Sequence, residues 1–265
     1  QLGGGQMRTQ IPNQKMVSNL AGVLGNTNPK PTTNKQHLNV STLKVQNLSV
    51  NIEDKSILND FSLEIPSGEV HAIMGPNGSG KSTLLAAMAG LLDFQGKLSI
   101  GRSDIKGFSL SQLASFRAYL TQFQRPVFNL GIAQYLALSI PSCAALSHSH
   151  TQAVIEELTK VLNIDDKLHR YIHQLSGGEW QRVRLCAACL QVWPSLNPDA
   201  KFLVLDEPAS SLDVGQEALL FILIERAASS GLSVVMSNHD LNRTLKHAHR
   251  ALLLNEGTMY SVGSV

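Results

Sequence analysis

The chain has 265 residues, of which 43% are hydrophobic and 16% are charged, and this balance excludes a protein that is disordered throughout. It contains no apolar run near the roughly 18 residues that a membrane-spanning helix needs, and its start lacks the pattern of a signal peptide, so we expect a soluble, cytoplasmic chain. The formal net charge is +2, but the charges are unevenly distributed along the sequence.

Residues 1–40 differ in composition from the rest of the chain. They contain eleven Asn or Gln residues, four Lys or Arg residues and no acidic residue, so the other 225 residues carry 18 basic and 20 acidic side chains. A segment this polar cannot bury enough apolar surface to offset its chain entropy, and we interpret it as a disordered leader or an artificially added segment. The body, residues 41–265, is slightly acidic, so its composition does not predict nucleic-acid binding.

Short apolar runs separated by turn residues begin at residue 41. Alternating apolar side chains predict two strands, at residues 43–50 and 61–65. A turn at residues 66–68 then precedes residues 70–74, a mostly apolar run that predicts a buried strand. A helix is predicted over residues 80–91.

A glycine-rich loop lies between that buried strand and that helix. It reads Gly-Pro-Asn-Gly-Ser-Gly-Lys-Ser and matches the pattern G-x-x-x-x-G-K-[ST] in the strand–helix context that the motif requires. Such a loop directs its N–H groups at phosphate oxygens, while Lys81 reaches the β- and γ-phosphates and the Ser82 hydroxyl binds Mg²⁺. We assign nucleotide contacts to Gly75, Pro76, Asn77, Gly78, Ser79, Gly80, Lys81, Ser82 and Thr83.

The rest of the chain alternates between helical and strand-like sequence. Residues 109–163 are mostly helical apart from a strand-like run at 118–121, with helices predicted at 131–138 and 152–162. Buried strands are predicted at residues 202–205, 232–236 and 251–254, each preceded by helical sequence. This alternation predicts an α/β fold with a largely parallel sheet that helices cover on both faces.

Two adjacent carboxylates, Asp206 and Glu207, follow the strand predicted at residues 202–205. Because neighbouring residues of a strand point to opposite sides, one carboxylate can hold a metal ion while the other faces a water molecule. We expect Asp206 to be the metal ligand and Glu207 to be the general base for attack on the γ-phosphate.

Between these two motifs, residues 175–182 read Leu-Ser-Gly-Gly-Glu-Trp-Gln-Arg, which resembles the signature of ABC-transporter ATPase subunits. The order of phosphate loop, signature, acidic strand, Ser-Leu-Asp at residues 211–213 and His239 resembles that family across residues 41–265.

The resemblance implies a P-loop NTPase fold of the ABC type over residues 41–265. In that fold a mostly parallel sheet core carries an antiparallel β subdomain and a helical signature subdomain, formed here by the insertion at about residues 109–185. The resemblance also implies a head-to-tail homodimer, in which ATP and Mg²⁺ lie between the phosphate loop of one subunit and the signature of the other. Two transmembrane permease subunits and, indirectly, a periplasmic substrate-binding protein are the implied partners, and nucleic acid is not. The implied location is peripheral, on the cytoplasmic face of the bacterial inner membrane.

Several residue roles rest on the resemblance. Gln122 would contact the metal and the attacking water and sense the membrane partner, His239 would contact the γ-phosphate as the switch histidine, and Asp213 would contact the opposite subunit. Nucleotide contacts across the dimer would come from Ser176, Gly177, Gly178 and Glu179. Physical chemistry supports this last role, because a hydroxyl and two amides that open a helix form an anion site.

The resemblance is closer to one branch of the family, the ATPases of bacterial cobalamin importers. It rests on residues 177–185, Asn197-Pro198 and residues 237–242, which lie mainly outside the general motifs. Importers of iron–siderophore complexes or haem share the architecture, and a soluble ABC-type ATPase is a further alternative. Where family members place an aromatic residue to stack on adenine, this chain has Ile52, so ATP rather than GTP is implied by the family and not by a stacking residue.

Three cysteines, Cys143, Cys186 and Cys189, are an odd number in a long chain and fit a reducing compartment. Cys186 and Cys189 have the C-x-x-C spacing of metal or redox sites, but no second pair completes a zinc site. We expect both to pack in the core of a helix.

Overall fold

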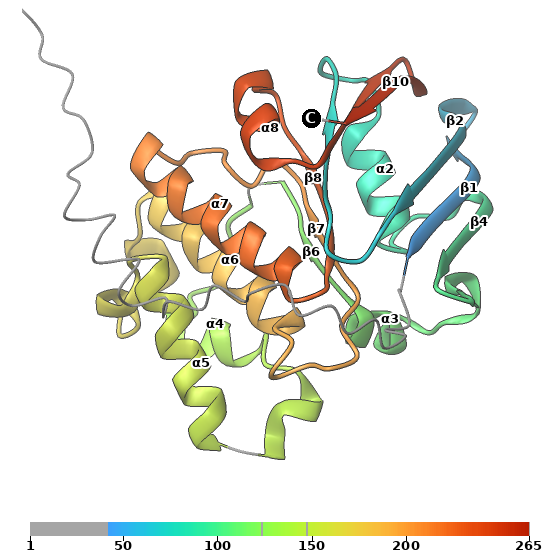
Figure 1. Ribbon diagram of the computed structural model, residues 1–265. Coiled ribbons are helices and arrows are strands. Elements are labelled where there is room, and N and C mark those ends of the chain that lie inside the picture. Colours follow the sequence, from blue (N-terminus) through green and yellow to red (C-terminus); the bar gives the residue numbers. More distant parts are fainter. Residues whose placement is uncertain (1–41, 123, 147, 265) are drawn as a thin grey trace, which may run out of the picture. The chain divides into compact units, whose positions relative to one another are not determined.

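A computed structural model describes residues 42–122, 124–146 and 148–264 of the chain. The leader expected at residues 1–40 lies outside the described residues. The described chain contains two sheets (Figure 1). The smaller sheet is antiparallel, has the order β2-β1-β4-β5, and consists of β1 (Leu43–Ile52), β2 (Lys55–Ile65), β4 (Gln95–Ile100) and β5 (Ser103–Asp104).

The larger sheet has the order β10-β9-β3-β8-β7-β6 and is parallel except for the pairing of β10 with β9. Its strands are β3 (Val70–Met74), β6 (Arg117–Leu120), β7 (Phe202–Leu205), β8 (Ser233–Ser237), β9 (Arg250–Asn255) and β10 (Thr258–Ser264). The helices are α2 (Lys81–Met88), α3 (Leu110–Phe116), α4 (Ile132–Ala137), α5 (His148–Val161), α6 (Gly177–Val192), α7 (Val214–Ser229) and α8 (Leu241–His247).

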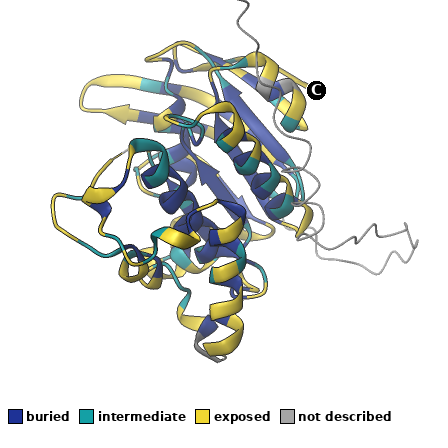
Figure 2. Cartoon of the chain, turned by 90° about the vertical axis from the view of Figure 1, so that its left-hand side faces the viewer, coloured by how far each residue is buried: buried dark blue, intermediate teal, exposed yellow. Residues whose placement is uncertain are grey.

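Two hydrophobic cores lie on opposite faces of this larger sheet. In β7, Leu203 and Leu205 pack into a core with α6 and α7, while Phe202 and Val204 pack into a second core with α2 and the antiparallel sheet. This split follows from the two-residue period of a strand. Figure 2 shows the buried strands between helices whose outer faces are exposed. The predicted α/β fold with helices on both faces of a mostly parallel sheet is confirmed.

The continuous apolar runs gave the most accurate boundaries, because β3 and β7 have the predicted ends. The predicted helix at residues 80–91 is shorter: α2 ends at Met88 because Gly90 adopts a left-handed conformation, φ 69, in which Leu91 N–H bonds to the Ala86 carbonyl. Strands β4 and β5 and helix α8 were not predicted, and α3 was covered only by the expectation that residues 109–163 are mostly helical. Strands β4 and β5 have few apolar residues, so no alternation marks them.

Candidate functional site

The phosphate loop connects β3 to α2 and depends on three glycines with positive φ. The angles are 151° at Gly75, 80° at Gly78 and 100° at Gly80, which residues with a Cβ rarely adopt. A Cβ on Gly75 would also lie 2.1 Å from the carbonyl oxygen of Leu254. The Lys81 ammonium turns back over the loop and donates to the carbonyls of Gly75 and Pro76, at 2.9 Å each.

The turn between β9 and β10 is hydrogen-bonded to the phosphate loop. The N–H of Gly257 donates to the carbonyl of Ser79 at 3.0 Å, and the carbonyl of Gly257 accepts from Asn59 N–H of β2 at 2.9 Å. Gly257 has φ 75, and a Cβ there would lie 2.1 Å from the Ile57 carbonyl oxygen. The loop is therefore fixed by strands from both sheets.

The buried carboxylate Asp206 follows β7 and bonds to the end of the neighbouring strand. The Ser237 hydroxyl donates to Asp206 Oδ1 at 2.7 Å and accepts from the backbone N–H of Glu207 at 2.8 Å. Sequence reasoning gave Ser237 no role in the site. A hydroxyl that ends an apolar run beside the acidic strand is the signal that could have identified it.

Glu207 lies in a turn rather than in the strand. β7 ends at Leu205, and Glu207 has φ 48, which is not a strand conformation. The expectation that Asp206 and Glu207 point to opposite sides because they belong to a strand was therefore wrong in its reason. Glu207 Oε1 lies 2.5 Å from Nε2 of His239, which follows β8. The structure therefore brings these two predicted site residues into direct contact.

A single cavity of about 480 Å³ joins the phosphate loop to the residues after β6, β7 and β8. Its lining consists of Ile57, Asn77, Gly78, Gly80, Lys81, Ser82, Thr83, Gln122, Glu207 and His239. Burial lowers the pKa of Lys81 from its ordinary value, while the negative charges of Glu207 and Asp206 oppose that shift. Residues separated by more than 150 positions thus share one electrostatic site, because the parallel strands that carry them end at the same edge of the sheet.

The antiparallel sheet contributes Ile57 to this cavity, a residue that the sequence analysis did not select. Ile52, which occupies the expected adenine-stacking position, is 46% exposed and does not belong to the described lining. An apolar side chain from β2 therefore adjoins the loop.

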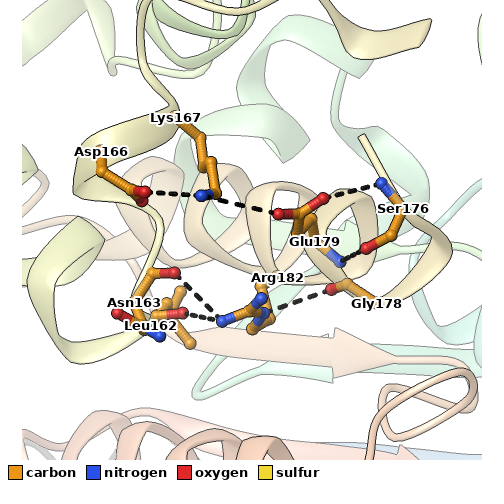
Figure 3. Close-up of polar contacts among 8 residues, drawn as sticks. All are labelled: Leu162, Asn163, Asp166, Lys167, Ser176, Gly178, Glu179 and Arg182. Atoms are coloured by element: carbon orange, nitrogen blue, oxygen red, sulfur yellow. Dashed lines mark hydrogen bonds and ion pairs between the residues drawn. The ribbon is translucent and has the colours of Figure 1, made fainter. Parts of the chain in front are cut away.

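The signature begins α6 with a complete capping box (Figure 3). The Ser176 hydroxyl accepts from Glu179 N–H at 3.2 Å, and Glu179 Oε2 accepts from Ser176 N–H at 2.8 Å. This second bond is the main reason why the pKa of Glu179 is lowered. The Lys167 ammonium, 3.8 Å from Glu179 Oε1, adds a favourable charge.

Figure 3 also shows how Arg182 fixes the start of α6. Its guanidinium donates to the carbonyls of Leu162 and Asn163, at 2.9 and 3.1 Å, and to the carbonyl of Gly178 at 3.4 Å. The end of α5 and the signature are therefore held together by one buried side chain.

The signature packs against the segment that precedes α7. A Cβ on Gly178 would lie 3.0 Å from the Ser211 carbonyl oxygen and 2.8 Å from Gln216 Oε1, so a larger residue would require the Gln216 side chain and the Ser211 backbone to shift. Asp213 caps α7 by accepting from Gln216 N–H at 2.8 Å. The predicted site residues thus form two sets, one at the phosphate-loop cavity and one at the signature. Among the described residues, the signature and residues 211–213 contribute nothing to the lining of that cavity.

The oxygen donors proposed for Mg²⁺ are chemically suitable. Ser82 offers a hydroxyl, Gln122 an amide oxygen and Asp206 a carboxylate, and Mg²⁺ prefers such hard oxygen ligands, completed by substrate phosphates and water. Among the described residues no group of three or more His, Cys, Asp or Glu side chains could hold a metal by itself. The set fits a metal that arrives with a phosphate ligand.

Cys186 and Cys189 lie in α6, are fully buried and are free thiols. Burial raises the pKa of both, which favours the uncharged thiol. Their predicted role in core packing is confirmed.

Comparisons with known proteins agree with this geometry. Residues 58–210 match the family described as ABC transporter. The chain is 54% identical over 222 residues to the "Vitamin B12 import ATP-binding protein BtuD" of Vibrio cholerae serotype O1, covering 84% of this chain and 87% of the relative. It is 51% identical over 223 residues to the protein of the same name from Vibrio atlanticus, again covering 84% and 87%.

Two solved structures share the fold at low sequence identity. An ATP-binding subunit of an ABC transporter superposes with a TM-score of 0.74 at 22% identity, covering 85% of this chain and 90% of that one. A nucleotide-free ATP-binding cassette from an ABC transporter gives 0.71 at 19% identity, with 84% and 91% covered. No helix in the described part of the chain is long and apolar enough to cross a bilayer.

Proposed function

The chain belongs to the ABC transporter family, and on that premise we propose that it is the ATP-hydrolysing subunit of an importer of cobalamin, vitamin B12. The observation that carries the proposal is the cavity that brings Lys81, Gln122, Glu207 and His239 together. The cargo rests on the relatives named as vitamin B12 import proteins, which are 51–54% identical to this chain. As an ATPase of this family, the chain works with membrane-embedded partners.

The phosphate loop binds the triphosphate through its N–H groups and through Lys81. A lysine ammonium has three donors, and the carbonyls of Gly75 and Pro76 take two of them, so one remains for a phosphate oxygen. The start of α2 adds favourable partial positive charge beside the loop. We assign the other loop contacts to the backbone from Gly75 to Thr83.

Ser82, Gln122 and Asp206 are the residues that hold Mg²⁺ with the nucleotide. The ion would supply positive charge that neutralises the phosphate oxygens. Ser237 donates to one oxygen of the Asp206 carboxylate and so fixes the orientation of the group. Gln122 follows β6 and lines the cavity, and we assign its amide to the metal ion and the attacking water.

Glu207 is the general base for hydrolysis. It accepts a proton from a water molecule whose oxygen bonds to the γ-phosphorus, while the bond from that phosphorus to the bridging oxygen breaks and ADP leaves. His239 Nε2 lies 2.5 Å from the Glu207 carboxylate, and we assign to this ring the contact with the γ-phosphate. The pairing of β7 with β8 thus sets the distance between Glu207 and His239.

The signature serves the nucleotide of a second copy of the chain. A serine hydroxyl has one donor and two acceptor positions, so Ser176 can accept from Glu179 N–H and still donate to a phosphate oxygen. Gly177, Gly178 and Glu179 lie beside it at the start of α6, and Asp213 lies next to the signature. In a head-to-tail homodimer, ATP closes the pair and hydrolysis reopens it, because the γ-phosphate contacts are then lost.

The surface for the membrane partner follows Gln122 in the chain. Val127 is fully exposed and Phe128 is 63% exposed, which is unusual for adjacent large apolar side chains. We assign this surface to two transmembrane permease subunits, which place the ATPase on the cytoplasmic face of the bacterial inner membrane. A periplasmic substrate-binding protein acts through those subunits.

Reconstitution tests the function and the cargo separately. The chain is purified with its membrane partners, placed in vesicles, and assayed for ATP hydrolysis and for uptake of cobalamin, a ferric siderophore and haem. ATP-dependent uptake of cobalamin alone is expected. Uptake of only the siderophore or haem would overturn the cargo and retain the ATPase, whereas hydrolysis without bound membrane partners or uptake would favour a soluble ABC-type ATPase.

A further inference from the structure

One face of α6 holds the main chain of the segment that carries Gln122. Arg184 is only 5% exposed, and its Nη2 donates to the carbonyl of Thr121 at 2.7 Å and to the carbonyl of Gln122 at 3.2 Å. The same nitrogen lies 3.0 Å from the Thr121 hydroxyl. A single guanidinium therefore holds the two peptide groups that flank the α-carbon of Gln122.

Trp180, one turn earlier on the same face of α6, binds the segment further along. Its indole N–H donates to the carbonyl of Gln124 at 2.8 Å, and its ring packs on Tyr135 with centroids 4.9 Å apart. In the opposite direction, Arg125 Nη2 donates to the carbonyl of Leu175, next to the signature, at 2.8 Å. The segment from Thr121 to Arg125 and the first two turns of α6 are thus joined at several points.

The other end of the Arg184 guanidinium extends toward the catalytic base. Its Nη1 donates to Gln181 Oε1 at 2.9 Å, and Gln181 Nε2 donates at 3.0 Å to the carbonyl of Pro208, which directly follows Glu207. The planar guanidinium, with its N–H donors in a fixed fork, bonds in both directions at once. Arg184 therefore lies between the Gln122 segment and the turn that carries Glu207.

We propose that Arg184, assisted by Trp180, is a positioning residue that holds Gln122 in the phosphate-loop cavity and links its placement to that of α6. The inference rests on the proposed ATPase function and adds a residue to it. Neither side chain lines the cavity, so Arg184 acts through the carbonyls of Thr121 and Gln122, and Trp180 acts through the carbonyl of Gln124.

The direct test is Arg184→Lys, which keeps a positive charge but replaces the planar fork by a single nitrogen. We expect kcat for ATP hydrolysis to fall by about 10- to 100-fold, the cost of a misplaced catalytic group, while the Kd for ATP changes less than about threefold. The matched control is Arg117→Lys. Arg117 is 7% exposed and donates to the Ala89 carbonyl at 2.7 Å, so the control loses a buried arginine–carbonyl bond outside the cavity and should retain kcat.

A double-mutant cycle separates positioning from a general loss of structure. In a Gln122→Ala background, Arg184→Lys should lower kcat by less than about twofold, because the residue through which it acts is gone. A full, multiplicative loss in that background overturns the proposal. A readout independent of hydrolysis is amide exchange at residues 121–125, which should become faster in Arg184→Lys and not in Arg117→Lys.

Trp180→Phe keeps the test decisive if Arg184→Lys fails to fold. It removes the indole N–H and retains most of the ring, and we expect faster amide exchange at residues 121–125 and a loss of kcat that disappears with Gln122→Ala. Unchanged kcat and exchange in a folded variant overturn the proposal. A wild-type protein that does not hydrolyse ATP, by contrast, would contradict the proposed function itself.

Discussion

The two helices that begin in glycine-rich sequence differ in how their first turns are completed. α2 follows Gly80, which has a left-handed conformation and provides no side-chain cap, whereas α6 follows Ser176, which forms a capping box with Glu179. The first N–H groups of α2 have no side-chain cap and are available to a bound anion. At α6 the capping box bonds these groups within the chain, and the Ser176 hydroxyl still has its proton to donate.

Their surroundings differ as well. The sheet edge places Gln122, Glu207 and His239 beside α2, and no signature residue joins that cavity in the described part of the chain. This difference agrees with the proposed homodimer, in which each copy of the chain would contribute two unlike halves of a nucleotide site. Changes beside α2 should affect binding and chemistry, while changes at α6 should affect the partner copy.

The largest expected effect is that of Glu207→Gln on the chemistry beside α2. An amide cannot accept the proton of the attacking water, so turnover should fall by roughly 10²-fold or more while ATP binding is retained. Single-turnover hydrolysis and equilibrium nucleotide binding measure the two quantities. Near-normal hydrolysis would remove Glu207 from the role of base.

Lys81→Ala should affect binding rather than chemistry alone. Losing one charge-assisted bond to phosphate weakens ATP binding by about 10- to 100-fold. Calorimetry with ATP measures the change, and Lys97→Ala, a substitution of an exposed lysine on β4, is the control. Equal affinities for all three proteins would contradict the assignment of the phosphate loop.

Mixing two inactive variants tests whether the halves lie on different copies. A chain with Lys81→Ala and a chain with Ser176→Arg are combined in equal amounts, so each mixed pair has one doubly damaged site and one intact site. Half of the pairs are mixed, and hydrolysis should recover to about a quarter of the wild-type rate. No recovery would mean that both groups act on the same nucleotide within one chain, or that one intact site is insufficient.

Ser176→Ala tests how much the capping box at the start of α6 contributes to stability. Loss of the N-cap bond to Glu179 N–H should lower the free energy of unfolding by about 1 kcal/mol. Ser176→Thr, which keeps a capping hydroxyl, should recover most of it. Equal denaturation midpoints for wild type and Ser176→Ala would show that the capping box adds no stability.

The smallest effect concerns the strand that leads to the phosphate loop. Burial lowers the pKa of His71, despite the opposing bond to Glu69 at 2.7 Å, while Arg250 and His249 reinforce the lowering. The unfolded chain therefore binds the proton more readily, and stability is full above the unfolded pKa of about 6.5 and declines as pH falls below it. Between about pH 7.5 and 5.5, the Tm of the wild type should fall a few degrees more than that of His71→Leu. Parallel melting curves would contradict this.

The sequence predicted the family, the phosphate loop and the buried strands, because these are encoded by neighbouring residues. Residue type and order along a short stretch are enough to predict the strand from Val70 to Met74 and the turn made by the loop glycines. Strand β4 was missed because only Leu98 and Ile100 mark it as apolar. The roles of the predicted site residues stay predictions, although most of those beside α2 meet in one cavity.

The tertiary structure decided which residues meet. Ser237 reaches both Asp206 and Glu207 because β8 lies beside β7, and Ile57 and Gly257 adjoin the loop because two sheets converge there. Arg184 binds the Gln122 segment across more than 60 positions. Local sequence sets backbone conformation and burial, whereas contacts between distant residues depend on strand order and helix packing, which no short pattern encodes.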